Sequence, residues 1–100
     1  MIIYNVTTQI DPGVHDEWMK WMKSHHIPAV MKTGCFIEYR MLKVLGEEAG
    51  GHTYSIQYTC KAMNDYHEYE QHHAPALRAE YIEKYKDQFI NFRTLLEVVS

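Results

Sequence analysis

The sequence predicts an α+β fold in which two helices cover one face of a four-stranded antiparallel sheet. Three observations predict it. Segments with strand-like alternation of apolar and polar residues lie near both ends of the chain and in its middle, and two helical segments separate them. A glycine-rich stretch typical of a hairpin joins the two central segments. The motif His-His-x-Pro occurs at 25–28 and again at 72–75, which indicates that one structural unit is used twice.

The composition is that of one globular domain spanning residues 1–100. Hydrophobic residues make up 46% of the chain and charged residues 23%, as in ordinary globular proteins. The ten Lys and Arg are scattered among acidic residues and the net charge is -3, which argues against the basic patch of a nucleic-acid-binding protein. No apolar run is long enough to span a bilayer, and the N-terminus lacks a signal-peptide pattern. We therefore expect a cytoplasmic protein that binds neither nucleic acid nor membrane.

The first half of the chain has the pattern of a strand followed by a helix. Residues 1–10 alternate between β-branched or aromatic side chains and polar ones, as in a half-buried strand. The pair Asp11-Pro12 then provides an N-cap acid and a proline for the first turn of a helix. This helix is predicted to run to about residue 33, because Gly34 suits a left-handed C-cap.

The centre of the chain is predicted to form a hairpin from residues 36–45 and 52–60, with residues 46–51 as its loop. Centring the turn on this loop pairs Tyr39 with Tyr58 and sorts polar from apolar side chains, which supports the register. Six residues then share the face covered by the helices: Ile37, Tyr39, Met41, Ile56, Tyr58 and Cys60.

The second half repeats the pattern of the first. Asn64 or Asp65 is predicted to cap a helix that runs to about residue 86, and residues 89–99 form the last strand. In this strand we place Arg93 and Glu97 on the uncovered face, opposite the more apolar parity. Two βαβ halves that share one hairpin make the split βαβ, or ferredoxin-like, plan βαββαβ, with spatial strand order 4-1-3-2.

The face of the sheet away from the helices combines polar and apolar residues. It is either a solvated face, which is common in antiparallel sheets, or a surface on which a second copy packs. We expect a homodimer formed through this face. The apolar residues Leu42, Val44, Phe89, Leu95 and Val99 are assigned to it together with Arg40, Gln57 and Arg93.

Three segments carry a resemblance to a known family. They are the stretch 18–36 with its Trp-x-x-Trp and His-Ile-Pro, the segment His-Ala-Pro-Ala-Leu at 73–77 and the ending Phe-Arg-Thr-Leu-Leu-Glu at 92–97. With these the chain resembles, over essentially its whole length, a small bacterial family known as domain of unknown function 4286. The resemblance implies the plan of the dimeric α/β barrels, which include antibiotic-biosynthesis-type monooxygenases and haem-degrading enzymes. It also implies a homodimer, and it brings no established catalytic residue.

The inner histidine of each repeated motif is the main candidate for a functional role. Helical spacing places His26 and His73 on the stripe that faces the sheet, and places His25 and His72 about 100° further round. Each proline also removes a helical N–H and frees the carbonyl four residues earlier. Either the inner histidines stabilise these kinks, or they point into a pocket as bases or orienting groups. A metal site is disfavoured because adjacent histidines on a helix point different ways, and nothing specific supports haem ligation.

The function that these patterns favour is binding of a small ligand in a His- and Tyr-lined pocket between sheet and helices. The alternatives are a cofactor-independent enzyme resembling the antibiotic-biosynthesis-type monooxygenases, and a purely structural or interaction module. Whether the protein is an enzyme, and which residues are catalytic, stays open. No cofactor, phosphate or metal motif is present, so we predict none, and we expect Cys35 and Cys60 to be reduced core thiols. The candidate pocket residues are His26, His73, Trp18, Tyr39, Tyr54, Tyr58, Tyr66 and Tyr69.

Overall fold

Strands and helices alternate in the predicted order in the computed structural model, which describes residues 1–46 and 52–100. Short turns of 3-10 helix and π-helix, Pro12–Val14 and Met22–His26, flank the first α-helix. The regular elements are β1 (Ile2–Ile10), α1 (His15–Trp21), α2 (Ile27–Lys32), β2 (Glu38–Lys43), β3 (His52–Cys60), α3 (Met63–His72), α4 (Ala74–Tyr85) and β4 (Phe89–Glu97).

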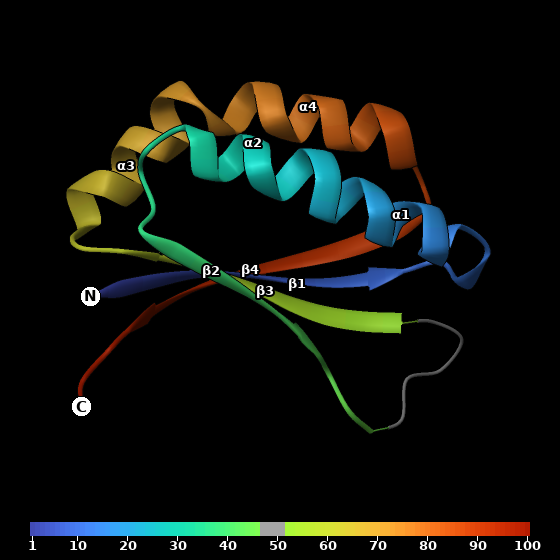
Figure 1. Cartoon of the computed structure of the whole chain (residues 1–100), viewed down its shortest axis with the longest axis horizontal. Coiled ribbons are helices and arrows are strands. Elements are labelled where there is room, and N and C mark those ends of the chain that lie inside the picture. The colour runs from blue at the N-terminus through green and yellow to red at the C-terminus, as the bar shows by residue number, and fades with distance from the viewer. Residues whose placement is uncertain (47–51) are drawn as a thin grey trace.

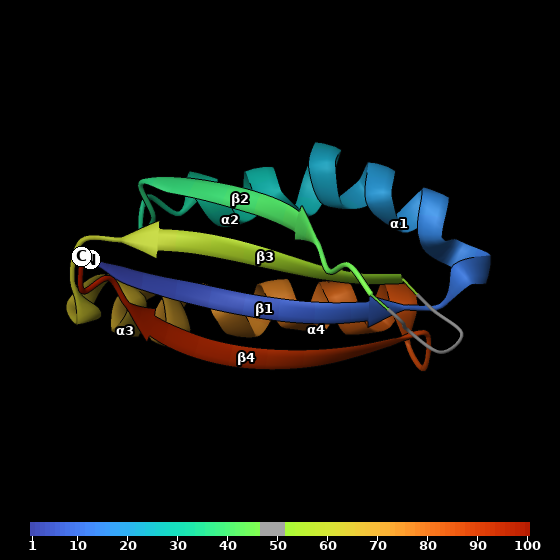
Figure 2. The same ribbon diagram turned by 90° about the horizontal axis from the view of Figure 1, so that it is seen from below.

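The strands of the described residues form one antiparallel sheet in the order β2-β3-β1-β4, which confirms the predicted arrangement 4-1-3-2. The helices all lie on one face of this sheet (Figure 1). Seen from below, α1 and α2 lie behind the β2 side and α3 and α4 behind the β1 and β4 side (Figure 2). The fold is thus the ferredoxin-like one, with an open face on the side away from the helices.

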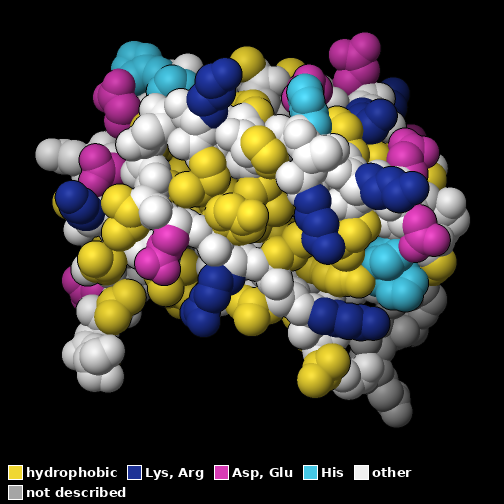
Figure 3. Space-filling view, viewed as in Figure 1, with side chains coloured by type: hydrophobic (Ala, Val, Ile, Leu, Met, Phe, Trp, Pro, Cys, Tyr) yellow, Lys and Arg dark blue, Asp and Glu magenta, His cyan; other side chains and the backbone are white. Residues whose placement is uncertain are grey.

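The predicted hairpin register is confirmed, since Tyr39 pairs with Tyr58 and Met41 with Ile56. Tyr39 is nevertheless 47% exposed, because β2 is an edge strand and the helices do not cover it fully. Hydrophobic side chains reach the surface between the helix layer and β2 (Figure 3). The predicted hairpin loop, apart from Gly46, lies outside the described residues.

The predicted orientation of β4 is wrong. β4 pairs with β1 so that Phe89, Asn91 and Arg93 share a face with Ile10 and its inward-facing neighbours, under the helices. Apolar residues occur on both parities of this strand, so its pattern alone does not identify the inner face. The uncovered face of β4 therefore carries Ile90, Phe92 and Leu96. The residues predicted there lie on the face under the helices instead: Phe89, Arg93, Leu95 and Glu97.

The first His-His-x-Pro motif forms a π-helical turn inside a continuous helical stretch. Pro28 has no N–H to donate to the carbonyl of Ser24, and the N–H of Ile27 donates to the carbonyl of Met22, five residues earlier. The widened turn accommodates the proline without breaking the helix. Beyond it the stretch ends as predicted at Gly34, whose φ of 79° suits glycine.

The second motif instead breaks the helix, so the predicted single helix of the second half is two helices, α3 and α4. His73 has a non-helical φ of −125° between them. The predicted cap is also wrong, since α3 begins at Met63 and Ala62 is its N-cap. Asp65 assists from inside the helix by accepting the N–H of Ala62 at 3.2 Å.

The core lies between the helix layer and the sheet and is unusually aromatic. Trp18 and Tyr85 are its largest fully buried side chains. Cys35 and Cys60 are both buried and free, as predicted. No helix of the described residues is long and apolar enough to cross a membrane; the cytoplasmic location stays a prediction.

Candidate functional site

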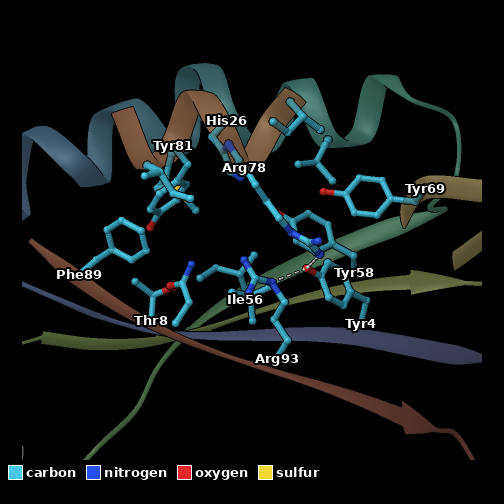
Figure 4. Close-up of a pocket in the computed structure, with 16 residues that line it drawn as sticks. Tyr4, Thr8, His26, Ile56, Tyr58, Tyr69, Arg78, Tyr81, Phe89 and Arg93 are labelled. Atoms are coloured by element: carbon cyan, nitrogen blue, oxygen red, sulfur yellow. Dashed lines mark hydrogen bonds between the residues drawn. The ribbon is translucent and has the colours of Figure 1, made fainter. Parts of the chain in front are cut away.

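A pocket of about 270 Å³ lies between the helix layer and the sheet (Figure 4). Its roof comes from the π-helical turn, α2, α3 and α4, and its floor from β1, β3 and β4. The walls are mostly apolar or aromatic, and none of the lining residues is acidic. The lining residues are Tyr4, Val6, Thr8, Met22, His26, Val30, Ile56, Tyr58, Tyr69, Leu77, Arg78, Tyr81, Ile82, Phe89, Asn91 and Arg93.

Two guanidinium groups meet at one end of the pocket. Arg78 donates from Nη2 to the hydroxyl oxygen of Tyr4 at 3.0 Å, and Arg93 donates to the same oxygen from Nε at 3.1 Å (Figure 4). Arg78 also binds both carboxylate oxygens of Glu70. Burial lowers the pKa of Arg78, but the hydrogen bonds to Glu70 and Tyr4 outweigh this and raise its pKa. This end of the pocket therefore holds one balanced ion pair and one further cation.

His26 lies in the roof between Tyr81 and Arg78 (Figure 4). Its ring stacks on Trp21 at 5.1 Å between centroids and meets the edge of Tyr81 at 5.1 Å. Burial lowers its pKa from 6.5 to about 4, with Glu80 opposing and His25 adding to the shift. The ring is therefore neutral at pH 7. Its Nδ1 is buried and has no hydrogen-bond partner among the described residues.

Hydroxyl and amide groups form the opposite end of the pocket. Trp18 donates from Nε1 to the hydroxyl of Tyr81 at 2.7 Å, and Thr8 donates to Oδ1 of Asn91 at 2.6 Å. Burial raises the pKa of Tyr81 to about 12, although hydrogen bonding with Trp18 and with Thr8 lowers it in part. The groups at this end are thus uncharged at neutral pH.

An aromatic wall lies at the Tyr4 end of the pocket (Figure 4). Tyr58 and Tyr69 line it, and Tyr4 stacks on Tyr58 at 6.1 Å. Burial raises the pKa of Tyr58 and of Tyr69. Both phenols therefore keep their protons near neutral pH, so the wall combines apolar rings with neutral hydroxyls.

Of the residues predicted to line a pocket, the structure brings three together. His26, Tyr58 and Tyr69 all lie on its wall. Trp18 does not line the pocket, but its indole N–H donates to the hydroxyl of Tyr81, which does. Tyr81, which is not among the predicted pocket residues, lines the pocket beside His26.

The other four predicted residues do not line this pocket. Tyr66 packs against the Tyr4 ring at 5.2 Å between centroids. The hydroxyl of Tyr54 is hydrogen-bonded to Nε2 of His15 at 2.8 Å. Tyr39 lies on the β2 edge, and His73 is half-buried at the helix break. His26 and His73 are therefore not equivalent, although His25 and His72 are both exposed as expected.

Several polar residues of the pocket are missing from the sequence prediction. Tyr4 and Thr8 both carry a hydroxyl on the inward parity of β1, which is a usable signal for polar groups facing a pocket. Asn91 and Arg93 lie on the parity of β4 that is predicted for the uncovered face, whereas the structure places it under the helices. Arg78 meets Tyr4 from 74 residues away in sequence, and no local pattern identifies such a contact.

Comparison with known families decides where the chain belongs. Residues 1–99 match the family described as "Domain of unknown function (DUF4286)". The chain belongs to this family. The resemblance seen in the sequence is thereby confirmed. A comparison with curated protein sequences gave no match.

Solved structures share the fold of this DUF4286 protein at low sequence identity. A dimeric ferredoxin-like protein from an uncultured marine organism is 15% identical with a TM-score of 0.73, over 100% of this chain and 96% of that one. A mutant of MhuD with two manganese protoporphyrin IX molecules per active site is 19% identical with a TM-score of 0.72, over 100% and 96%. A protein of the ethyl tert-butyl ether (EthD) family from Bacillus halodurans is 10% identical with a TM-score of 0.69, over 99% and 100%. At these identities the likeness shows the fold alone.

The described residues also bear on metal binding. They contain no group of three or more His, Cys, Asp or Glu side chains placed to hold a metal ion. The chemistry on the pocket wall is that of hydrogen bonding and charge: two guanidinium groups, several hydroxyls, an amide and a neutral imidazole.

Proposed function

We propose that this protein binds a small organic ligand in the pocket between the helix layer and the sheet. The observation that carries the proposal is the buried Nδ1 of His26, which faces no hydrogen-bonding partner among the described residues. A buried polar atom without a partner costs about 1–3 kcal/mol. A ligand with a matching polar group removes this cost, and binding energy of that kind is available only at an unsatisfied site.

The size and lining of the pocket support the same proposal. Its volume is about 270 Å³, whereas an apolar cavity of about 150 Å³ holds one benzene molecule. The pocket therefore has room for one ring with a short side chain. Predominantly apolar walls with a few polar groups at fixed places are typical of ligand sites.

The test is a screen of ring-containing fragments by ligand-observed NMR, repeated on two variants. Ile82→Trp adds bulk to a residue that lines the pocket and is 52% exposed, so the core is left intact. Ile37→Trp is the matched control, because Ile37 is 46% exposed and does not line the pocket. We expect fragments that bind the wild type and Ile37→Trp to lose binding to Ile82→Trp. The proposal would be contradicted if no fragment binds the wild type, or if the fragments bind Ile82→Trp as well as they bind Ile37→Trp and the wild type.

Proton transfer by His26 is a second candidate function, since the ring is neutral at pH 7 and its Nδ1 is unoccupied. A neutral imidazole can accept a proton from a bound molecule. Fragments that bind and carry an acidic C–H are incubated with the protein in D₂O, and loss of the proton signal is followed by NMR. We expect exchange that His26→Gln abolishes. Equal exchange in wild type and His26→Gln would rule out this role.

We also propose that the protein is a homodimer that packs through the uncovered face of its sheet. Ile90, Phe92 and Leu96 on β4 are 55%, 64% and 42% exposed. Leu42, at the other edge of the same face, is 38% exposed. A structural neighbour with the same fold is described as a dimeric ferredoxin-like protein, which supports this arrangement. A stable homodimer buries about 1,200 Å² or more in total.

The dimer is tested by light scattering coupled to size-exclusion chromatography. We expect wild type to elute with twice the chain mass of 11.9 kDa. Phe92→Asp places a charge in the apolar β4 part of the proposed interface and should give the monomer mass. Met63→Asp is the control, because Met63 is an exposed apolar residue on the helix layer. A wild-type monomer at micromolar concentration would refute the proposal.

A further inference from the structure

The charged end of the pocket has an unbalanced cation. Arg78 is paired with Glu70, but Arg93 has no acidic partner in the part of the chain that the structure describes. Its guanidinium donates to Tyr4 through Nε only. The N–H donors of both Nη groups therefore remain available to a ligand. The pocket wall has no Asp or Glu that could balance this charge.

The hydroxyl of Tyr4 adds a third donor at the same place. Its oxygen accepts a hydrogen bond from Arg78 and another from Arg93. With these two bonds the oxygen's acceptor capacity is used, and its own hydrogen is left to donate. Among the described residues this hydrogen has no acceptor. Arg78, Arg93 and Tyr4 point toward one another at this end, while Tyr81, Phe89 and Thr8 lie at the other (Figure 4).

We propose that the ligand of this pocket is an aromatic or similarly apolar carboxylate, bound by Arg93 and the Tyr4 hydroxyl with its ring toward the interior. This inference rests on the proposed ligand-binding function and specifies its substrate class. The planar fork of a guanidinium matches the two oxygens of a carboxylate. One uncompensated positive charge balances one carboxylate, whereas a doubly charged phosphoryl group would leave a negative charge in a largely apolar pocket.

The interior of the pocket fits the rest of such a ligand. Val6, Val30 and Ile56 provide apolar surface on the pocket wall, and Tyr58 provides a ring face. At about 270 Å³ the pocket has room for one ring and a short acid side chain. An uncharged molecule of the same shape would fill the same space but would leave the donors of Arg93 and Tyr4 unused.

The experiment compares two probes that differ in charge and hardly in shape, 3-phenylpropanoate and 3-phenylpropanamide. Calorimetry or ligand-observed NMR gives the affinity of each for wild type, Arg93→Gln and Lys20→Gln. We expect wild type to prefer the propanoate by about ten- to a hundredfold, the range for a hydrogen bond to a charged group. Arg93→Gln should lose this preference, and Lys20→Gln should keep it, because Lys20 is an exposed cation on α1. Far-UV circular dichroism checks that both variants fold.

The possible failures are distinguishable. Equal affinity for both probes, or a preference that survives Arg93→Gln, overturns the carboxylate inference and leaves ligand binding intact. Tighter binding of phenylphosphonate than of 3-phenylpropanoate also overturns it, in favour of a phosphoryl ligand. Should neither probe bind while uncharged fragments bind and are blocked by Ile82→Trp, the anionic class is wrong and the pocket still binds ligands. Absence of any binder refutes the proposed function together with this inference.

Discussion

Acid should destabilise this protein through His26. Burial lowers the pKa of His26 from 6.5 to about 4, so between these pH values the ring is neutral in the folded protein and protonated in the unfolded chain. The unfolded chain then binds more protons, and stability falls as the pH falls. This contribution to stability is fully present above about pH 6.5 and is lost as the pH drops through about 4. The difference between the two pKa values corresponds to about 3 kcal/mol of unfolding free energy.

The assay is urea denaturation of wild type and His26→Gln at several pH values between 7 and 4. Carboxylates also titrate in this range, so the informative quantity is the difference between the two proteins at each pH. We expect wild type to lose about 3 kcal/mol more than His26→Gln on going from pH 7 to pH 4. His67→Gln is the control, because His67 is exposed, and it should follow the wild-type profile. Protein concentration is held constant, since a dimer's stability depends on it.

The refuting result is specific. If the unfolding free energies of wild type and His26→Gln decline in parallel from pH 7 to pH 4, His26 is not held neutral by burial. Its Nδ1 would then not be available to a ligand as part of a neutral ring. An NMR titration of the His26 ring that gives a midpoint close to 6.5 would refute the same reasoning directly.

Two further substitutions test local features by urea denaturation. Trp18→Phe removes the buried donor to the Tyr81 hydroxyl and should lower the unfolding free energy by about 1–3 kcal/mol; an unchanged stability would show that this bond contributes nothing. Gly34→Ala puts a side chain on a residue with φ of 79° and should cost about 1–2 kcal/mol through backbone strain alone, since no atom lies within 4 Å of the added carbon. A neutral or stabilising effect would mean that the C-cap tolerates another conformation.

The order of elements and the hairpin register are predictable from the sequence because they depend on local patterns. The alternation around Tyr39 and Tyr58 admits one register that sorts polar from apolar side chains, and the structure has that register. The inner face of β4 depends instead on how the strand meets β1. Phe89 pairs with Ile10, and this pairing fixes the orientation of every later residue of β4. An edge strand with apolar residues on both parities carries no signal of its own for this choice.

The candidate site is likewise predictable only where it depends on local patterns. Periodicity places His26, Tyr58 and Tyr69 toward the space between the layers, and all three lie on the pocket wall. The charged end depends on contacts of Tyr4 with residues 74 and 89 positions away, which no periodicity reveals. The repeated motif also does not indicate which proline is accommodated by a π-helical turn and which one breaks the helix. His26, in the π-helical turn, lines the pocket, whereas His73, at the helix break, does not.

In the proposed binding mode, the placement of polar groups in the pocket favours one orientation of the carboxylate ligand. Arg93 is exposed at the charged end, where water reduces the cost of its unpaired charge. His26 is less exposed and is neutral. A carboxylate ligand bound the other way round would bury its charge beside a ring that burial keeps uncharged, and would leave Arg93 without a partner. The favoured orientation therefore brings the uncharged part of the ligand to His26. It follows that any proton taken up by His26 comes from that part of the molecule and not from its acid group.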